Sequence, residues 1–349
     1  MKTNHIYVGD CKEVMQGFPE DSIDLVVTSP PYWGLRDYGN EEQLGLEHHP
    51  QLYVDNLVDI CREIKRVLKP EGSFWLNLGD TYYGSGKGAG GDIEKSKEIY
   101  QLPKESIPNQ SERSNWLQPK QLLGIPWRVA TALQEDGWIL RNCVIWYKPN
   151  HMPESVKDRL TKSYEFFFFF VKSRKYYFDL DSIREPLADV SITRMQYPRY
   201  AEDSKGDTGK YGVQSKDYGG KYNNTDAESI GSPRARMATR DTVSFNNPKG
   251  KNPGDMWSIS TQSFPGSHFA VFPEKLIEPI IKSSSPKDGV VLDPFCGSGT
   301  TCYAARKLGR RFIGIELNEE YAEMARERVR GRTFKRDLSD VKKLTSYDS

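Results

Sequence analysis

Apolar and amphipathic stretches alternate from Ile6 to Asp80, the pattern of an α/β fold. Short apolar runs predict strands at IYVGD (6–10), IDLVV (23–27) and SFWLNLGD (73–80). Between the last two, apolar residues recur at three- and four-residue spacing and predict a helix from Leu52 to Leu68. The sequence Lys-Pro-Glu-Gly at 69–72 is expected to end that helix.

The pattern resumes after a polar stretch from Gly84 to Gln118, which reads as a loop. A helix is predicted near Lys120 to Glu135, followed by strands at NCVIWYK (142–148) and SYEFFFFFVKS (163–173). Five consecutive phenylalanines, Phe166 to Phe170, indicate core packing of a strand that is buried on both faces.

Periodicity fades between about Leu187 and Asp255, where Gly, Asn, Ser, Tyr, Arg and Lys dominate. The α/β pattern then returns until Val329. Its predicted elements are a helix around Pro273–Ser283, the strand GVVLDPF (289–295), a glycine turn, a helix to Leu308, the strand RFIGIEL (311–317) and a last helix to Val329. We therefore expect α/β parts at 1–186 and 256–330, a separate region at 187–255 and a frayed tail at 331–349.

Length and composition narrow the class of protein. A chain of 349 residues has room for about two domains. Its mean hydropathy is −0.68, and it has neither an apolar window long enough to span a membrane nor a readable secretory signal, so we expect a cytoplasmic protein. The five cysteines are scattered without a CxxC pair, which argues against a disulfide framework or a metal site. A net charge of +1 means that any affinity for nucleic acid must be local.

The glycine turn predicts a nucleoside site. An apolar strand ending at Asp293 leads into Gly297-Ser-Gly299, which opens a helix, and the next strand ends at Glu316, nineteen residues after Gly297. Such a carboxylate is placed for ribose hydroxyls. The third glycine of the dinucleotide fingerprint would fall on Cys302, so a nucleoside without phosphates fits better. Asp293 could pair with a cationic amino group of that ligand.

A second turn, Ser29-Pro30-Pro31-Tyr32, follows an apolar strand and is expected at its carboxyl end, where open α/β sheets bind ligands. The two prolines fix the backbone and remove two N–H donors, so the Ser29 hydroxyl and the carbonyl oxygens form a rigid set of acceptors. Tyr32 offers a face on which a planar base can stack. Hydrogen bonds accepted from an exocyclic amine would localise its lone pair for attack on an electrophilic methyl group, without a metal or a covalent intermediate.

The two turns together resemble the amino-directed DNA methyltransferases, which carry Asp/Asn/Ser-Pro-Pro-Tyr/Phe and Phe-x-Gly-x-Gly motifs. Here the first motif begins at Ser29 and the second at Phe295, an order that resembles the β group of this restriction–modification family. The resemblance implies a Rossmann-like, circularly permuted sheet that binds S-adenosyl-L-methionine. It makes 1–186 the catalytic part, 187–255 the target-recognition region and 256–330 the cofactor-binding part of one methyltransferase domain.

The resemblance also assigns roles to residues. It places Asp10 at the adenine amine of the cofactor and Phe272 in a helix that closes over it. The expected catalytic residues are Ser29, Pro30, Pro31 and Tyr32. The expected cofactor-binding residues are Asp10, Phe272, Asp293, Pro294, Phe295, Cys296, Gly297, Ser298, Gly299, Thr300, Thr301 and Glu316. In the recognition region the candidates for DNA contacts are Arg194, Arg199, Arg234, Arg236 and Arg240.

Serine at the first position of the turn resembles the subgroup that methylates N4 of cytosine in double-stranded DNA. Base flipping would bring the amine to the turn. N6-adenine methylation is the alternative, and C5 chemistry is excluded because no Pro-Cys pair occurs. RNA or protein methyltransferases carry the motifs in the reverse order, and a non-catalytic DNA-binding regulator would retain only the scaffold. A partner restriction endonuclease and a monomeric or homodimeric state fit the resemblance.

Overall fold

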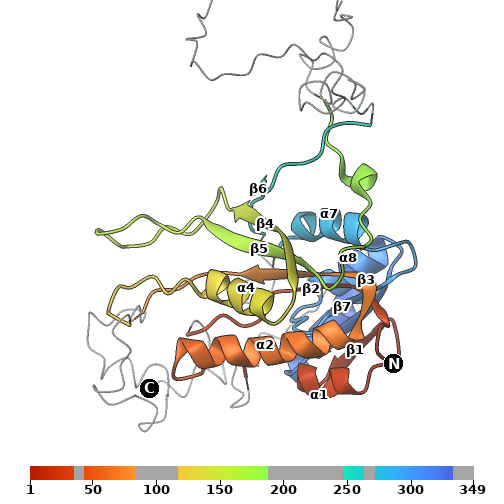
Figure 1. The fold of residues 1–349 in the computed structure, drawn as a ribbon, viewed down its shortest axis with the longest axis horizontal. Coiled ribbons are helices and arrows are strands. Elements are labelled where there is room, and N and C mark those ends of the chain that lie inside the picture. The colour runs from red at the N-terminus through yellow and green to blue at the C-terminus, as the bar shows by residue number, and fades with distance from the viewer. Residues whose placement is uncertain (35–42, 84–116, 188–246, 248, 263–271, 333–349) are drawn as a thin grey trace, which may run out of the picture. The chain divides into compact units, whose positions relative to one another are not determined.

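A single eight-stranded sheet organises the protein, with the strands in the order β1-β8-β7-β2-β3-β5-β4-β6 (Figure 1). The computed structural model describes residues 1–34, 43–83, 117–187, 247, 249–262 and 272–332. In sheet order the strands are β1 (His5–Val8), β8 (Arg311–Glu316), β7 (Val290–Asp293), β2 (Ile23–Thr28), β3 (Leu68–Leu78), β5 (Tyr164–Val171), β4 (Ile139–Tyr147) and β6 (Met256–Ser258).

The chain divides into two units, residues 1–183 with 254–349 and residues 184–253. The sheet and its helices belong to the first unit. The helices of that unit are α1 (Cys11–Gln16), α2 (Pro50–Val67), α4 (Ile125–Glu135), the short 3-10 helix η2 (Leu180–Ile183), α7 (Glu274–Ser284), α8 (Thr300–Lys307) and α9 (Glu319–Val329). In the second unit Glu185 and Lys251 form an antiparallel bridge.

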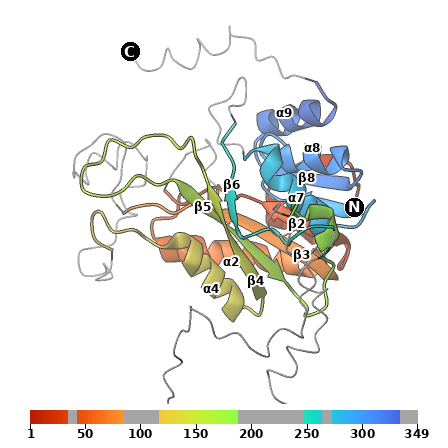
Figure 2. The ribbon, with the colours of Figure 1, turned by 90° about the horizontal axis from the view of Figure 1, so that it is seen from above.

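Strands from the two ends of the chain share the sheet, with β8 and β7 lying between β1 and β2. β1 pairs in parallel with β8, and β2 pairs in parallel with β7 and with β3. The red and blue strands in Figure 2 lie side by side for this reason. This arrangement confirms the predicted Rossmann-like sheet in which the cofactor half follows the catalytic half in the sequence.

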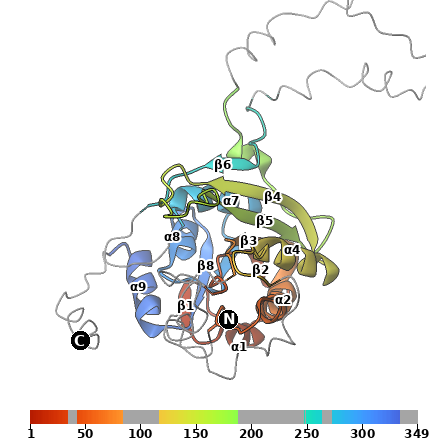
Figure 3. The same cartoon turned by 90° about the vertical axis from the view of Figure 1, so that its left-hand side faces the viewer.

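Helices cover both faces of the sheet, and each face has its own hydrophobic core (Figure 3). α1, α2 and α4 pack on one face against side chains such as Phe74 and Phe168, whereas α7, α8 and α9 pack on the other against Trp75 and Phe169. Neighbouring residues of a strand point to opposite faces, so both faces of β3 and β5 need apolar residues. The prediction for the phenylalanine run is confirmed for Phe167 to Phe170, which are at most 5% exposed, whereas Phe166 is only half-buried and lines the cleft described below.

Several boundaries differ from the predicted ones. The helix ends at Val67, next to the predicted stop at 69–72, but the strand begins earlier than predicted, because residues 68–72 already belong to β3. β5 is antiparallel to both β3 and β4. Neither α1 nor β6 was predicted, since each is too short to show a period.

The start of α4 has a tertiary cause. The helix begins at Ile125 rather than near Lys120, after Gly124 in the left-handed region at φ 68°. The Asp80 carboxylate, at the end of β3, accepts hydrogen bonds from the N–H groups of Gly124 and Ile125, both at 3.1 Å. A carboxylate from another element therefore satisfies the first turn of this helix.

Several predicted features lie outside the described residues. These are the loop from Gly84 to Gln118 apart from its last two residues, nearly all of the region 187–255 and most of the tail. The assignment of those regions stays a prediction. Within the described part of the chain, no helix has the length and apolar character needed to cross a membrane.

Candidate active site

A cleft of about 1840 Å³ opens at the carboxyl ends of the parallel strands. Residues at the carboxyl ends of four of these strands line the cleft. Asp10 comes shortly after β1, Ser29 follows β2, and Asp293 and Glu316 are the last residues of β7 and β8. Carboxyl ends of parallel strands meet at one edge of a sheet, which is why positions far apart in the sequence share this cleft.

Glu316 anchors the glycine turn at one end of the cleft. Its Oε2 accepts a hydrogen bond from the Gly297 N–H at 2.8 Å, and its Oε1 accepts one from the Asn318 N–H at 3.0 Å. Burial raises the pKa of the Glu316 carboxyl. Each carboxylate oxygen can accept a second hydrogen bond, so this side chain can hold the turn and also bind ligand hydroxyls.

Asp10 has a structural role that the sequence did not indicate. It lines the cleft, and its Oδ1 accepts from the N–H groups of Lys12 and Glu13 at 2.9 and 3.0 Å, so that it caps α1. This cap fixes the carboxylate at the edge of the cleft, and its other oxygen can take an amine.

Asp293 is almost fully enclosed, with 2% of its surface exposed. Its Oδ1 accepts hydrogen bonds from the Thr28 hydroxyl at 2.6 Å and from the Phe295 N–H at 3.1 Å, and so links β7 to β2. Burial raises the pKa of Asp293 to about 6, although these hydrogen bonds act in the opposite direction. The ionised carboxylate is therefore costly unless a cation joins it.

The glycine turn depends on close packing and on a residue that the sequence did not reveal. Gly299 has φ +78° at the N-cap of α8, and a Cβ there would lie 2.8 Å from the Cβ of Ala325 in α9. Arg328, also in α9, donates to Ser298 Oγ at 3.1 Å and to Thr300 Oγ1 at 2.8 Å. Burial lowers the pKa of this guanidinium. Contacts from α9 thus hold the glycine turn in place.

The structure brings nearly all of the predicted catalytic and cofactor-binding residues to one cleft. The cleft is lined by Ser29, Pro30, Pro31, Tyr32, Asp10, Phe272, Asp293, Pro294, Phe295, Cys296, Gly297, Ser298, Thr300 and Glu316. Of the predicted set, Gly299 and Thr301 do not line it, because Gly299 packs against α9 and Thr301 is buried at 1% exposure. The five candidate arginines, Arg194, Arg199, Arg234, Arg236 and Arg240, lie outside the described residues.

The Ser-Pro-Pro-Tyr turn is held from both sides. Tyr53 of α2 donates its hydroxyl to the Pro31 carbonyl at 2.9 Å. The Tyr32 ring lies against the backbone of Gly79, where a Cβ would approach ring atom Cε2 to 2.6 Å. Burial raises the pKa of Tyr32 well above its ordinary value, so its hydroxyl keeps its proton.

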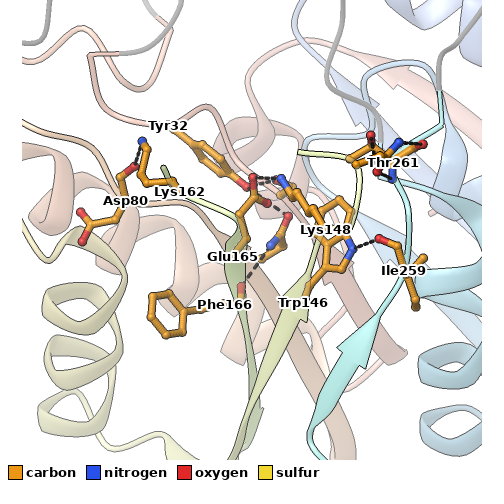
Figure 4. Close-up of polar contacts among 12 residues, drawn as sticks. Tyr32, Asp80, Trp146, Lys148, Lys162, Glu165, Phe166, Ile259 and Thr261 are labelled. Atoms are coloured by element: carbon orange, nitrogen blue, oxygen red, sulfur yellow. Dashed lines mark hydrogen bonds and ion pairs between the residues drawn. The ribbon is translucent and has the colours of Figure 1, made fainter. Parts of the chain in front are cut away.

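A polar cluster behind this turn went unnoticed in the sequence. The Tyr32 hydroxyl lies 2.9 Å from Glu165 Oε2 (Figure 4). It also lies 3.0 Å from Asn77 Oδ1, and the Ser29 hydroxyl lies 3.3 Å from Tyr32 Oη. Glu165 also forms an ion pair with Lys148. One signal was available, because Lys148 and Glu165 are charged residues at the ends of two strongly apolar strands.

Trp146 fixes the position of the lysine. Lys148 Nζ lies 4.2 Å from the centroid of the Trp146 ring, whose N–H donates to the Ile259 carbonyl at 2.8 Å (Figure 4). Next to this cluster Lys162 donates to the Asp80 carbonyl at 2.9 Å, and burial lowers the pKa of this lysine.

Comparisons with known proteins agree with this geometry. A family model described as DNA methylase matches residues 23–327. The chain is 39% identical over 329 residues to the Type II methyltransferase M.SmaI of Serratia marcescens, covering 94% of this chain and 91% of that relative. It is 39% identical over 326 residues to M.Cfr9I of Citrobacter freundii, covering 93% and 87%.

Two solved structures have a similar fold. The PvuII DNA methyltransferase, described as cytosine-N4-specific, matches with a TM-score of 0.55 at 20% identity and covers 93% of this chain and 89% of its own. A DNA modification methylase from Thermus thermophilus, solved in complex with S-adenosyl-L-methionine, matches with a TM-score of 0.50 at 23% identity and covers 94% of each chain.

Proposed function

Because this chain belongs to the DNA methylase family and is a Type II DNA methyltransferase, we propose that it methylates the exocyclic N4 of cytosine in double-stranded DNA with S-adenosyl-L-methionine. One observation carries the proposal: the Ser-Pro-Pro-Tyr turn and the glycine turn open into the same cleft, although the sequence separates Ser29 from Gly297 by most of its length. A methyl donor and an acceptor amine can therefore meet there.

The carboxylates of the cleft fit this cofactor. S-adenosyl-L-methionine presents hydrogen-bond donors in its ribose hydroxyls, its adenine amine and its ammonium group. Glu316, Asp10 and Asp293 supply acceptors for these three in turn, with Phe272 and the turn from Pro294 to Thr300 around them. Three carboxylates would repel a pyrophosphate, so the site does not favour a dinucleotide.

The residues of the first turn act on the amine. Ser29 Oγ and the Pro30 carbonyl would accept hydrogen bonds from the two N–H groups of N4, which localises the nitrogen lone pair. S-adenosyl-L-methionine, when bound, supplies the methyl group: the C–S bond breaks with its electron pair moving to sulfur as the nitrogen bonds the methyl carbon, and one N4 proton is then released. Tyr32 would stack on the cytosine ring and hold it in the orientation that N4 needs to attack the methyl carbon.

Base flipping follows from the position of the turn. Ser29 is partly buried in the cleft, and an amine that is paired inside a duplex cannot reach it. Serine in the first position of the turn favours cytosine over adenine, and N6-adenine methylation is the alternative. The PvuII enzyme, a relative in fold, is described as cytosine-N4-specific, in keeping with the proposal.

The region 187–255 would read the DNA sequence, with its arginines at phosphates or guanine edges. A partner endonuclease of the same specificity would complete a restriction–modification pair. The DNA substrate and the five free cysteines fit a cytoplasmic location.

Nucleoside analysis tests the proposed reaction. Plasmid DNA from a methylation-free host that expresses the chain is digested to nucleosides, which are separated and weighed. We expect N4-methylcytosine. N6-methyladenine would overturn the choice of base while leaving the family intact. If the purified protein bound S-adenosyl-L-methionine and DNA but modified neither base, the non-catalytic regulator would be the better interpretation.

A further inference from the structure

We propose that Glu165 is a positioning residue for methyl transfer: through the Tyr32 hydroxyl it sets the direction of the hydrogen bond from Ser29, so that Ser29 faces the amine as an acceptor. This inference rests on the proposed function. It is carried by the contacts of the Tyr32 hydroxyl with Glu165, which Figure 4 shows, and with Asn77 and Ser29.

The argument begins with the single proton of the Tyr32 hydroxyl. Two acceptors lie within hydrogen-bond distance of Tyr32 Oη, namely Glu165 Oε2 at 2.9 Å and Asn77 Oδ1 at 3.0 Å. The Asn77 amide cannot turn its NH₂ group toward Tyr32 without losing the hydrogen bond from Nδ2 to the Phe166 carbonyl at 3.0 Å. The Tyr32 proton therefore points at these acceptors, and the carboxylate is the stronger of the two.

The orientation of the Tyr32 proton determines which partner donates in the hydrogen bond between Ser29 and Tyr32. Ser29 Oγ lies 3.3 Å from Tyr32 Oη, and since the Tyr32 proton points elsewhere, these oxygens form a hydrogen bond only if Ser29 donates. With its own proton engaged, Ser29 has only lone pairs left for the cleft. A hydroxyl that donated to N4 would instead occupy the lone pair that must attack the methyl carbon.

Lys148 keeps Glu165 in this role. The two side chains are 18% and 17% exposed, so removing their charges from water is costly and the pair adds little net stability. The cation is also held by the Trp146 ring at 4.2 Å. Because Lys148 offers only donors, a glutamine at position 165 would turn its carbonyl oxygen to Lys148 and its NH₂ group to Tyr32. The Tyr32 proton would then have only the neutral Asn77 Oδ1 as acceptor, and without the charged partner the Tyr32 oxygen accepts the Ser29 proton less strongly.

The Glu165→Gln variant therefore keeps the size of the side chain and removes the charged acceptor. We expect its rate constant for methyl transfer, measured in single turnovers with saturating DNA and cofactor, to fall about tenfold or more. Its dissociation constants for DNA and for S-adenosyl-L-methionine should stay within about twofold of the parent values, since the change acts on the transition state.

A double-mutant cycle separates positioning from general support of the fold. Tyr32→Phe removes the hydroxyl and keeps the ring, and we expect a similar loss of rate. Adding Glu165→Gln to Tyr32→Phe should then lower the rate by less than about twofold, because Glu165 acts through the missing hydroxyl. Losses that multiply, or a loss confined to substrate binding, would overturn the inference.

The matched control is Glu63→Gln. Glu63 forms an ion pair with Arg66 at 2.9 Å, its side chain is 21% exposed, and it does not line the cleft. This variant should keep the parent rate. If Glu165→Gln does not fold, an unchanged rate in Tyr32→Phe alone overturns the inference.

The parent protein tells the two proposals apart. If it forms N4-methylcytosine and Glu165→Gln is equally fast, only the positioning role fails. If the parent forms another product or none, the proposed function itself fails.

Discussion

The buried carboxylate of Asp293, proposed to bind the ammonium group of the cofactor, lowers the stability of the ligand-free protein when it is ionised. Its pKa rises from the ordinary 3.8 to about 6 because burial disfavours the charge. Between these values the folded protein binds more protons than the unfolded chain, so this group lowers stability as pH rises through that window. Above about pH 6 the full cost is present, and an ammonium group bound beside the carboxylate would offset it.

The Asp293→Asn variant tests this cost. Below pH 4 it should be about as stable as the parent, and its advantage should grow toward pH 6 to an upper bound of about 3 kcal/mol, since each pKa unit corresponds to about 1.4 kcal/mol. Its affinity for S-adenosyl-L-methionine at pH 7 should fall. Denaturant unfolding across this range and calorimetric titration are the measurements. A variant less stable than its parent at pH 7 would contradict the assignment.

At the scale of elements, the glycine turn is held in place by contacts with α9. α8 begins at Gly299, whose missing side chain lets Ala325 of α9 approach, while Arg328 of the same helix binds the hydroxyls of the turn. Phe295 to Thr300 therefore take their shape from a helix more than twenty residues further along the chain. The glycine turn and α9 therefore depend on each other for their packing.

Gly299→Ala should damage both stability and cofactor binding. The new Cβ would lie 2.8 Å from the Cβ of Ala325, and φ +78° is itself unfavourable for alanine. Gly309→Ala is the control, because Gly309 has φ +72° but open space around it. We expect the control to lose about 1 to 2 kcal/mol with normal cofactor affinity, and Gly299→Ala to lose more and to bind weakly. Equal losses in chemical denaturation would show that the contact with α9 is unimportant.

At the scale of the whole molecule, we propose that chemistry and recognition occupy different parts of the chain. The cleft belongs entirely to the unit formed by residues 1–183 and 254–349, and the residues proposed to read DNA lie in 187–255. The net charge of only +1 means that this division cannot depend on a general attraction to DNA.

Exchange of residues 187–255 for the corresponding segment of M.SmaI tests the division. We expect the hybrid to methylate the sequence that the donor of the segment recognises, because base contacts determine sequence specificity and the proposal assigns these contacts to this segment. Its affinity for S-adenosyl-L-methionine should match the parent value. Sequencing of modified genomic DNA reports the site, and an unchanged site would assign recognition to another part of the chain.

The amino-acid sequence by itself determined the alternation of strands and helices and both turns. Apolar periods are local, and a turn such as Ser29 to Tyr32 carries its backbone geometry in its own prolines. The order of the two motifs resembles that of the β group, and this resemblance predicted the permuted sheet, in which parallel strands bring their carboxyl ends together. That is why most predicted cofactor residues do line the cleft.

Only the tertiary structure decided which side chains act together. Tyr32 meets Glu165 across 133 positions of sequence, and Asp80 caps a helix 45 positions away. The antiparallel pairing of β5 with β3 carries Glu165 to the turn, and no local pattern encodes that pairing. The direction of a hydroxyl depends on every acceptor around it, so the sequence could suggest Ser29 as an acceptor, but the contacts proposed to direct its proton required Glu165, Asn77 and Tyr32 to be placed in space.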